Sequence, residues 1–206
     1  MMREADAGIR TPDLPLTRRL LCQLSYVGNG REVYPQMCRR KAARGFSIRT
    51  VHRYEVEQLA PEHLDLIRPL LVDLHLDEQP HYPDHPQFTR EQIEAQLAPV
   101  RARFAGENVV LAVRDQDGTV LGFCWVVLFD PGTGLEGEVA EVYVGEQHRG
   151  QGVGEALVAR AVELFQERGV TLGYVWTRGA NEPAIRLYQA AGFEPTRQLV
   201  LTWYPG

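Results

Sequence analysis

Cysteine is scarce in this chain of 206 residues, because only Cys22, Cys38 and Cys124 are present. An odd number of cysteines without C-x-x-C spacing indicates neither a disulfide framework nor a zinc knuckle, so we expect a reducing, cytoplasmic environment. Long apolar runs are also missing. No stretch approaches the roughly 18 residues that a membrane span requires, and Leu20-Leu21-Cys22 is too short for the core of a secretory signal. We therefore expect no membrane association.

Basic residues are scarce in most of the chain. Residues 47–206 carry thirteen Arg and no Lys against twenty-three Asp and Glu, whereas residues 1–46 carry nine basic and four acidic residues. An acidic body repels a phosphate backbone, which disfavours nucleic acid as a partner, and its field attracts cations. The length suits one domain with an extension.

Residues 1–46 lack hydrophobic periodicity, and prolines and glycines interrupt each short candidate element. We expect this segment to be a disordered extension that does not join the core. Gly8-Ile9-Arg10-Thr11 and residues 22–26 resemble peptides translated from the antisense strand of a transfer-RNA gene, which favours a misassigned start codon and a natural start nearer Met37. The alternative is a basic tail that binds RNA, although its basic clusters are short and lack interleaved aromatics.

Hydrophobic periodicity predicts a mixed α/β sheet for residues 47–206. We expect a first strand over residues 47–57 and then a helix that opens at Pro61 and is kinked at Pro69. Thr89 and Gln92 have the spacing of a capping box, which predicts the start of a second helix. Asp115-Gln116-Asp117-Gly118 is a hairpin signal. The remaining predicted elements are strands over 108–114, 119–129 and 138–144, a helix over 153–167, a strand over 171–177, a helix over 181–191 and a strand region over 193–203.

A glycine-rich loop, Arg149-Gly150-Gln151-Gly152-Val153-Gly154, follows the strand that ends at Val144 and opens a helix. The N–H groups of such a loop and of a helix N-terminus, with Arg149 beside them, suit a phosphate group. The alternative is a tight packing turn. The glycines do not form G-x-G-x-x-G, and no Gly-Lys pair exists for a P-loop, which disfavours dinucleotide oxidoreductases and ATPases.

Two sequence motifs resemble those of the GNAT superfamily of acyl-CoA-dependent N-acetyltransferases, and they occur along the chain in the same order as in that family. The first is R/Q-x-x-G-x-G/A, met by Arg149, Gly152 and Gly154 and preceded by Glu141-Val142-Tyr143-Val144. The second is Asn181-x-x-Ala184-x-x-Leu187-Tyr188-x-x-x-Gly192-Phe193. The resemblance covers about residues 47–206. It implies a central mixed sheet flanked by helices, with central strands that splay near 142–144 and 174–176.

The resemblance also implies roles for single residues. The backbone of Val142 and Val144 would pair with the pantetheine arm of acetyl-CoA like an added strand, and Asn181 would contact the cofactor near that arm. Tyr188 would be the general acid that protonates the departing thiolate. Glu141 is the candidate general base, acting through water, with a solvated strand carboxylate as the alternative. The loop residues that would hold the pyrophosphate are Arg149, Gly150, Gln151, Gly152, Val153 and Gly154.

We therefore predict an enzyme that transfers an acetyl group from acetyl-CoA to a primary amine, either a small cation or an amine of a protein, by direct attack. Trp176 stands where some ribosomal-protein acetyltransferases of the family have a glutamate, so that base is not carried over. No metal is expected, since His81, Asp84 and His85 have no second cluster beside them. A noncatalytic acyl-CoA-binding sensor is the alternative, and residues 197–203 are a candidate contact for a homodimer.

Overall fold

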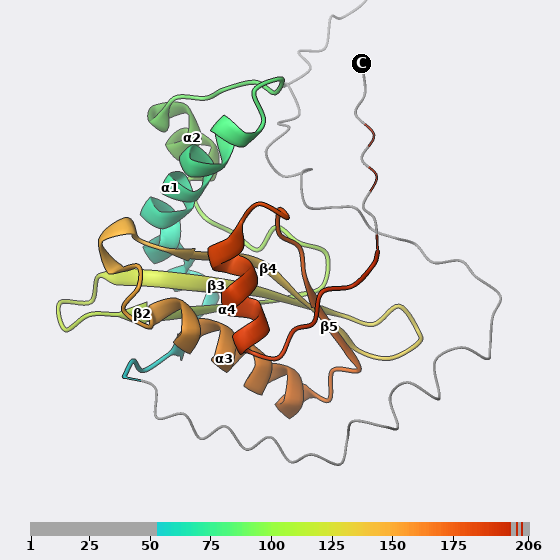
Figure 1. Ribbon diagram of the computed structural model, residues 1–206. Helices are drawn as coiled ribbons and strands as arrows, with labels where there is room; N and C mark the ends of the chain where they lie inside the picture. The colour runs from blue at the N-terminus through green and yellow to red at the C-terminus, as the bar shows by residue number, and fades with distance from the viewer. Residues whose placement is uncertain (1–52, 199–200, 202, 204–206) are drawn as a thin grey trace, which may run out of the picture. The chain divides into compact units, whose positions relative to one another are not determined.

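The computed structural model describes residues 53–198, 201 and 203 (Figure 1). The predicted extension over residues 1–46, the first part of the strand predicted over 47–57 and residues 199, 200 and 202 of the candidate dimer contact lie outside the described residues. Of that first strand, the described part contains β1, Glu57–Gln58.

A mixed sheet of five strands in the order β1-β2-β3-β4-β5 organises the fold. All neighbouring strands are antiparallel except β4 and β5, which are parallel. The hairpin predicted at residues 115–118 is confirmed, because it joins β2 to β3 and Gly118 adopts φ 83°. After β1, the strands are β2 (Glu107–Arg114), β3 (Val120–Phe129), β4 (Glu136–Val144) and β5 (Leu172–Val175).

The α-helices are α1 (Arg68–Glu78), α2 (Arg90–Leu97), α3 (Val153–Arg168) and α4 (Glu182–Ala190). Short 3-10 helices are η3 (Pro61–Ile67), η4 (Gln79–His81) and η5 (Glu146–His148). The capping box of α2 is confirmed, since the Gln92 N–H donates to Thr89 Oγ1 at 3.3 Å and the Thr89 N–H donates to Gln92 Oε1 at 2.8 Å.

Two of the predicted elements are wrong. Pro69 does not kink a helix that starts at Pro61; it stands in the first turn of α1, after the separate helix η3. A proline is tolerated there because the first N–H groups of a helix have no partner within it. Residues 193–198 of the predicted last strand form no strand.

Two apolar layers cover the two faces of the sheet. Helices η3, α1 and α2 pack on one face with Phe123, Trp125 and Tyr143, and we call this the α1 face. Helix α3 and Tyr188 of α4 pack on the other with Cys124 and Val139, and we call this the α3 face. Figure 1 shows α3 and α4 crossing in front of the strands.

Candidate active site

The sheet opens between β4 and β5, the central strands predicted to splay, although Tyr174 and Val175, predicted to lie in the splayed part, are still paired with β4. The two strands pair only from Glu136 opposite Leu172 to Val139 opposite Val175. Directly after Val139, the pairing of β4 with β3 skips Ala140, so β4 carries a bulge at the point where it leaves β5. A bulge bends its strand and increases the local twist, which accounts for the separation.

The rest of β4 presents backbone groups of two residues to this opening. The Gly145 N–H donates to the Leu121 carbonyl of β3 at 2.9 Å. Because hydrogen-bonded pairs alternate along an antiparallel ladder, the backbone groups of Tyr143 also face β3, and those of Val142 and Val144 point the other way, toward the opening. The Val144 carbonyl accepts a hydrogen bond from Arg149. The groups that face the opening and are not used in the ladder are therefore the N–H and C=O of Val142 and the N–H of Val144, on the two residues predicted to pair with an extended ligand.

The paired ends of β4 and β5 are held by one aromatic side chain of α3. Gly137 and Gly173 lie directly opposite each other, and the Phe165 ring packs on both. A methyl group on Gly173 would lie 2.9 Å from Phe165 Cδ2, and a methyl group on Gly137 would also overlap the ring. Close contact at one end of the pair and separation at the other make the opening V-shaped.

The glycine-rich loop lies directly before α3. Gly150 has φ 71° and Gly152, the N-cap of α3, has φ 93°, a backbone region that favours glycine. No side chain caps this helix, so its first N–H groups are available to an anion. Gly154 faces α4, since an added methyl group would lie 3.4 Å from Leu187 Cδ2. The loop can therefore accept a phosphate group, and its glycines also serve packing.

Arg149 is held by partners within the protein. Its Nε donates to the Val144 carbonyl at 3.0 Å, its Nη2 donates to Asp77 Oδ2 at 2.9 Å, and its guanidinium lies 5.1 Å from the centre of the Tyr143 ring. Tyr143 also donates its hydroxyl proton to Asp77 Oδ2, at 2.8 Å. Asp77 was not predicted as a site residue, because no motif marks a carboxylate at the end of α1.

Tyr188 lies on the α3 face and is 9% exposed. Helix α4 begins after Asn181, whose Oδ1 accepts the Ala184 N–H at 3.4 Å, so Asn181 acts here as a helix cap. Burial, followed by the nearby Cys124, raises the pKa of Tyr188, which keeps its phenol protonated at neutral pH. Within residues 53–198 no group forms a hydrogen bond with this hydroxyl, which leaves it available to a ligand.

Two glutamates of β4 lie on the α1 face near the opening. The bulge at Ala140 places both Glu138, opposite Val127, and Glu141, opposite Trp125, on this face. Glu141 is 8% exposed, no described group hydrogen-bonds its Oε2, and burial raises its pKa while Arg103 opposes the rise. Burial raises the pKa of Glu138, which is only partly buried, to about 7. Sequence reasoning missed Glu138, because its burial depends on the sheet.

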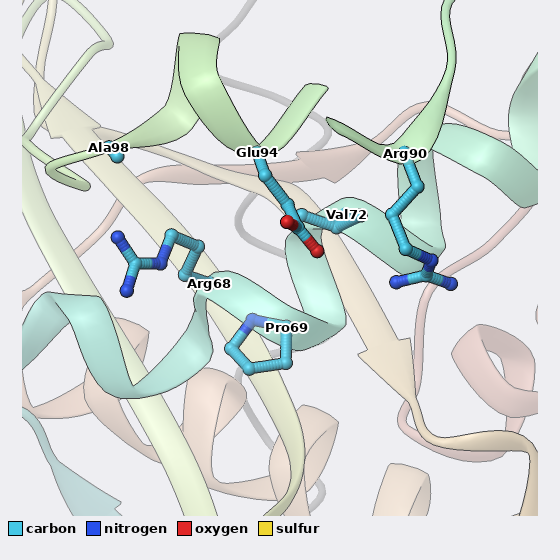
Figure 2. Close-up of a pocket in the computed structure, with 6 residues that line it drawn as sticks. All are labelled: Arg68, Pro69, Val72, Arg90, Glu94 and Ala98. Carbon is cyan, nitrogen blue, oxygen red and sulfur yellow. The ribbon is translucent and has the colours of Figure 1, made fainter. Parts of the chain in front are cut away.

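Other parts of the described chain add no site of this kind. Among residues 53–198, 201 and 203, no three His, Cys, Asp or Glu side chains are grouped so that they could hold a metal ion, and no helix is both long and apolar enough to span a bilayer. Burial raises the pKa of Cys124 to about 12, which makes it a poor nucleophile. A hollow of about 420 Å³ lies between α1 and α2 (Figure 2). It is lined by none of the predicted site residues; its lining is Arg68, Pro69, Val72, Arg90, Glu94 and Ala98.

Comparisons with known proteins agree with this geometry. Residues 68–193, more than half of the chain, match the model of the acetyltransferase (GNAT) family. The chain is 33% identical over 116 residues to a mycothiol acetyltransferase of Arthrobacter sp. (strain FB24), and 33% identical over 119 residues to that of Thermobifida fusca (strain YX). These matches cover 55% of this chain and 35% and 37% of the relatives, so the chain spans about a third of their length.

Solved structures show the same fold. One described as a probable acetyltransferase has a TM-score of 0.57 and 24% identity, over 73% of this chain and 97% of its own. An acetyltransferase of Trypanosoma brucei has a TM-score of 0.50 and 24% identity, over 72% of this chain and 99% of its own. With the family match over residues 68–193, the chain belongs to the GNAT family of acetyltransferases, enzymes that transfer an acyl group.

Proposed function

We propose that this protein transfers an acetyl group from acetyl-CoA to a primary amine. The observation that carries the proposal is the V-shaped opening between β4 and β5, in which backbone groups of Val142 and Val144 face the opening and lead to the uncapped N-terminus of α3. An extended arm with amide groups fits the former and a pyrophosphate fits the latter. The matches to acetyltransferases support the same donor.

The charge of the side chains beside the opening indicates the class of the acceptor substrate. Glu136 and Glu138 of β4 lie next to Tyr174 in the pairing of the sheet, and both carboxylates raise the pKa of Tyr174, after the larger effect of burial. Carboxylates and aromatic rings at the paired end of the opening favour a cationic amine. An ammonium group must lose a proton before it attacks, and Glu138 has a pKa suited to accept it near neutral pH. Glu141, more deeply buried, is the second candidate for this role.

Tyr188 supplies the proton that the departing thiolate needs. Its phenol stays protonated at neutral pH, and it lies on the α3 face together with Val142 and Val144. Backbone N–H groups of β4 that face the opening can also stabilise the negative charge that develops on the acyl oxygen. A noncatalytic acyl-CoA sensor is the alternative function, and it would need none of the proton donors and acceptors.

The test is calorimetric titration of the full chain with acetyl-CoA, compared with Gln151→Glu. Gln151 is an exposed residue of the glycine-rich loop, and the substitution changes charge with almost no change of shape. A negative charge close to a pyrophosphate should weaken binding about tenfold, or about 1.4 kcal/mol. The substitution also removes the hydrogen bond that Gln151 Nε2 donates to the Gln147 carbonyl at 2.8 Å, whereas the negative charge at the helix N-terminus stabilises α3. Urea unfolding of the variant measures the net change in stability and separates it from the change in binding.

The matched control is Gln166→Glu, which makes the same change on an exposed residue near the other end of α3. We expect it to bind acetyl-CoA as the wild type does. No binding by the folded wild type, or equal weakening by the two substitutions, would contradict the proposal. Where wild-type binding is confirmed, release of free thiol with a panel of amines separates the enzyme from the sensor.

A further inference from the structure

The last two residues of α1 contact the two opposite sides of the V-shaped opening. Asp77 accepts hydrogen bonds from Tyr143 of β4 and from Arg149 of the glycine-rich loop, at 2.8 and 2.9 Å. Its neighbour Glu78 accepts a hydrogen bond from Arg178 Nη2 at 3.0 Å, and Arg178 lies in the segment between β5 and α4. Successive residues of an α-helix point about 100° apart, which lets adjacent carboxylates reach two different walls.

Each contact fixes the segment of chain that leads into one of the two helices of the site, α3 or α4. On the β4 side, Arg149 also binds the Val144 carbonyl, so Asp77 positions the strand end and the loop that opens α3. On the β5 side, the Arg178 carbonyl accepts the Asn181 N–H at 2.9 Å, so Glu78 positions the turn that caps α4. Helix α4 carries Tyr188.

The backbone itself does not set the width of this opening, because no pairing joins β4 to β5 after Val139 and Val175. On the α3 face, the two walls are linked by the packing of α3 against α4, as at Gly154 and Leu187. On the α1 face, they are linked through Asp77 and Glu78. The Glu78–Arg178 pair is the less exposed of the two, with side chains 35% and 30% exposed, and less exposed ion pairs are screened less by solvent.

We propose that Asp77 and Glu78 form a two-sided clamp that sets the width of the opening, and that they are positioning residues for the arm of the acyl donor. The inference rests on the proposed function, because the arm is that of acetyl-CoA. Breaking either contact releases one wall, so the strand-like contacts of the arm with β4 should weaken more than those of the pyrophosphate with the loop, whose N–H groups belong to the start of α3.

The experiment compares two ligands on the full chain: acetyl-CoA, and 3′-phospho-ADP, which keeps the pyrophosphate and lacks the arm. The dissociation constant of 3′-phospho-ADP divided by that of acetyl-CoA measures what the arm contributes. Partial unfolding does not change this ratio, because it weakens the binding of both ligands equally. We expect Glu78→Gln to lower this ratio about threefold through weaker binding of acetyl-CoA alone. Asp77→Asn should lower it too, with unchanged or tighter binding of 3′-phospho-ADP because Arg149 is released.

The control is Asp73→Asn, which removes a comparable ion pair from the same helix: Asp73 Oδ1 accepts from Arg90 at 2.7 Å, on the side of α2. It should leave the ratio unchanged. The exchange Glu78→Arg with Arg178→Glu should restore the ratio that Glu78→Gln loses. A wild-type ratio kept by both Glu78→Gln and Asp77→Asn would overturn the clamp alone, whereas a wild type that does not bind acetyl-CoA would overturn the proposed function and the clamp with it.

Discussion

Replacing Glu138 by Gln should make the protein more stable at high pH and leave its stability at low pH nearly unchanged. Burial raises the pKa of Glu138 from 4.5 to about 7 in the folded chain. A shift of one pKa unit corresponds to about 1.4 kcal/mol, so this shift of about 2.5 pKa units corresponds to a penalty of about 3.4 kcal/mol for the ionised side chain in the folded state. Because Glu138 is partly exposed, solvent screens its charge, and we expect about half of that value.

The sign of the effect follows from the proton balance. Below the unfolded pKa, Glu138 is protonated in both states and costs nothing; as the pH rises through the folded pKa, the folded chain must ionise a partly buried group and stability is lost. The glutamine side chain of the variant does not titrate, so the variant should exceed the wild type by about 1.5 kcal/mol at about pH 8 and by little at about pH 5.

Urea unfolding of both proteins at these two pH values measures the difference. The control Glu94→Gln changes an exposed glutamate of α2 and should show no such dependence on pH. An equal free-energy difference between Glu138→Gln and the wild type at the two pH values would refute the assignment of a raised pKa to this side chain. The same variant, tested for acetyl transfer, shows whether Glu138 also accepts the proton of the amine.

Two further predictions concern catalysis and packing. Tyr188→Phe should lower kcat about 100-fold, in line with the loss of a general acid, without weakening acetyl-CoA binding, and steady-state kinetics beside calorimetry tests both parts; a normal kcat would exclude Tyr188 as the acid. Gly137→Ala should destabilise the fold by about 2 kcal/mol because the added methyl group overlaps Phe165, whereas Gly179→Ala, which meets nothing within 4 Å, should be nearly neutral in the same urea titration. Equal stability of these two variants would show that the Phe165 ring yields easily.

Local chemistry made much of the fold predictable. The capping box at Thr89 and the turn ending at Gly118 depend on residues close in sequence, so their side-chain preferences act directly on the backbone. The start of α3 after Gly152 was predictable for the same reason. Pro69 was misjudged because the periodicity of its apolar neighbours continues across the junction of η3 and α1, where the hydrogen-bond pattern changes.

The features that depend on distant contacts were not predictable. Asp77 meets Arg149 across 72 residues of sequence, and Glu78 meets Arg178 across 100. The raised pKa of Glu138 depends on the elements that bury it, which a single sequence does not show. The motifs thus indicated the loop residues and Tyr188. The carboxylates that orient the two walls of the opening, and the raised pKa of Glu138, became visible only when the chain was folded.

The bulge at Ala140 has a consequence for the length of β4. Side chains of a regular strand alternate between its two faces, but the extra residue in the bulge lets Glu138 and Glu141, three positions apart, lie on one face. Deleting Ala140 would leave Val139 opposite Val126 and Glu141 opposite Trp125, so the ladder with β3 would become regular without a change of partners. The bend that separates β4 from β5 would then be lost, and a single residue with a methyl side chain therefore determines whether a ligand has room between the two strands.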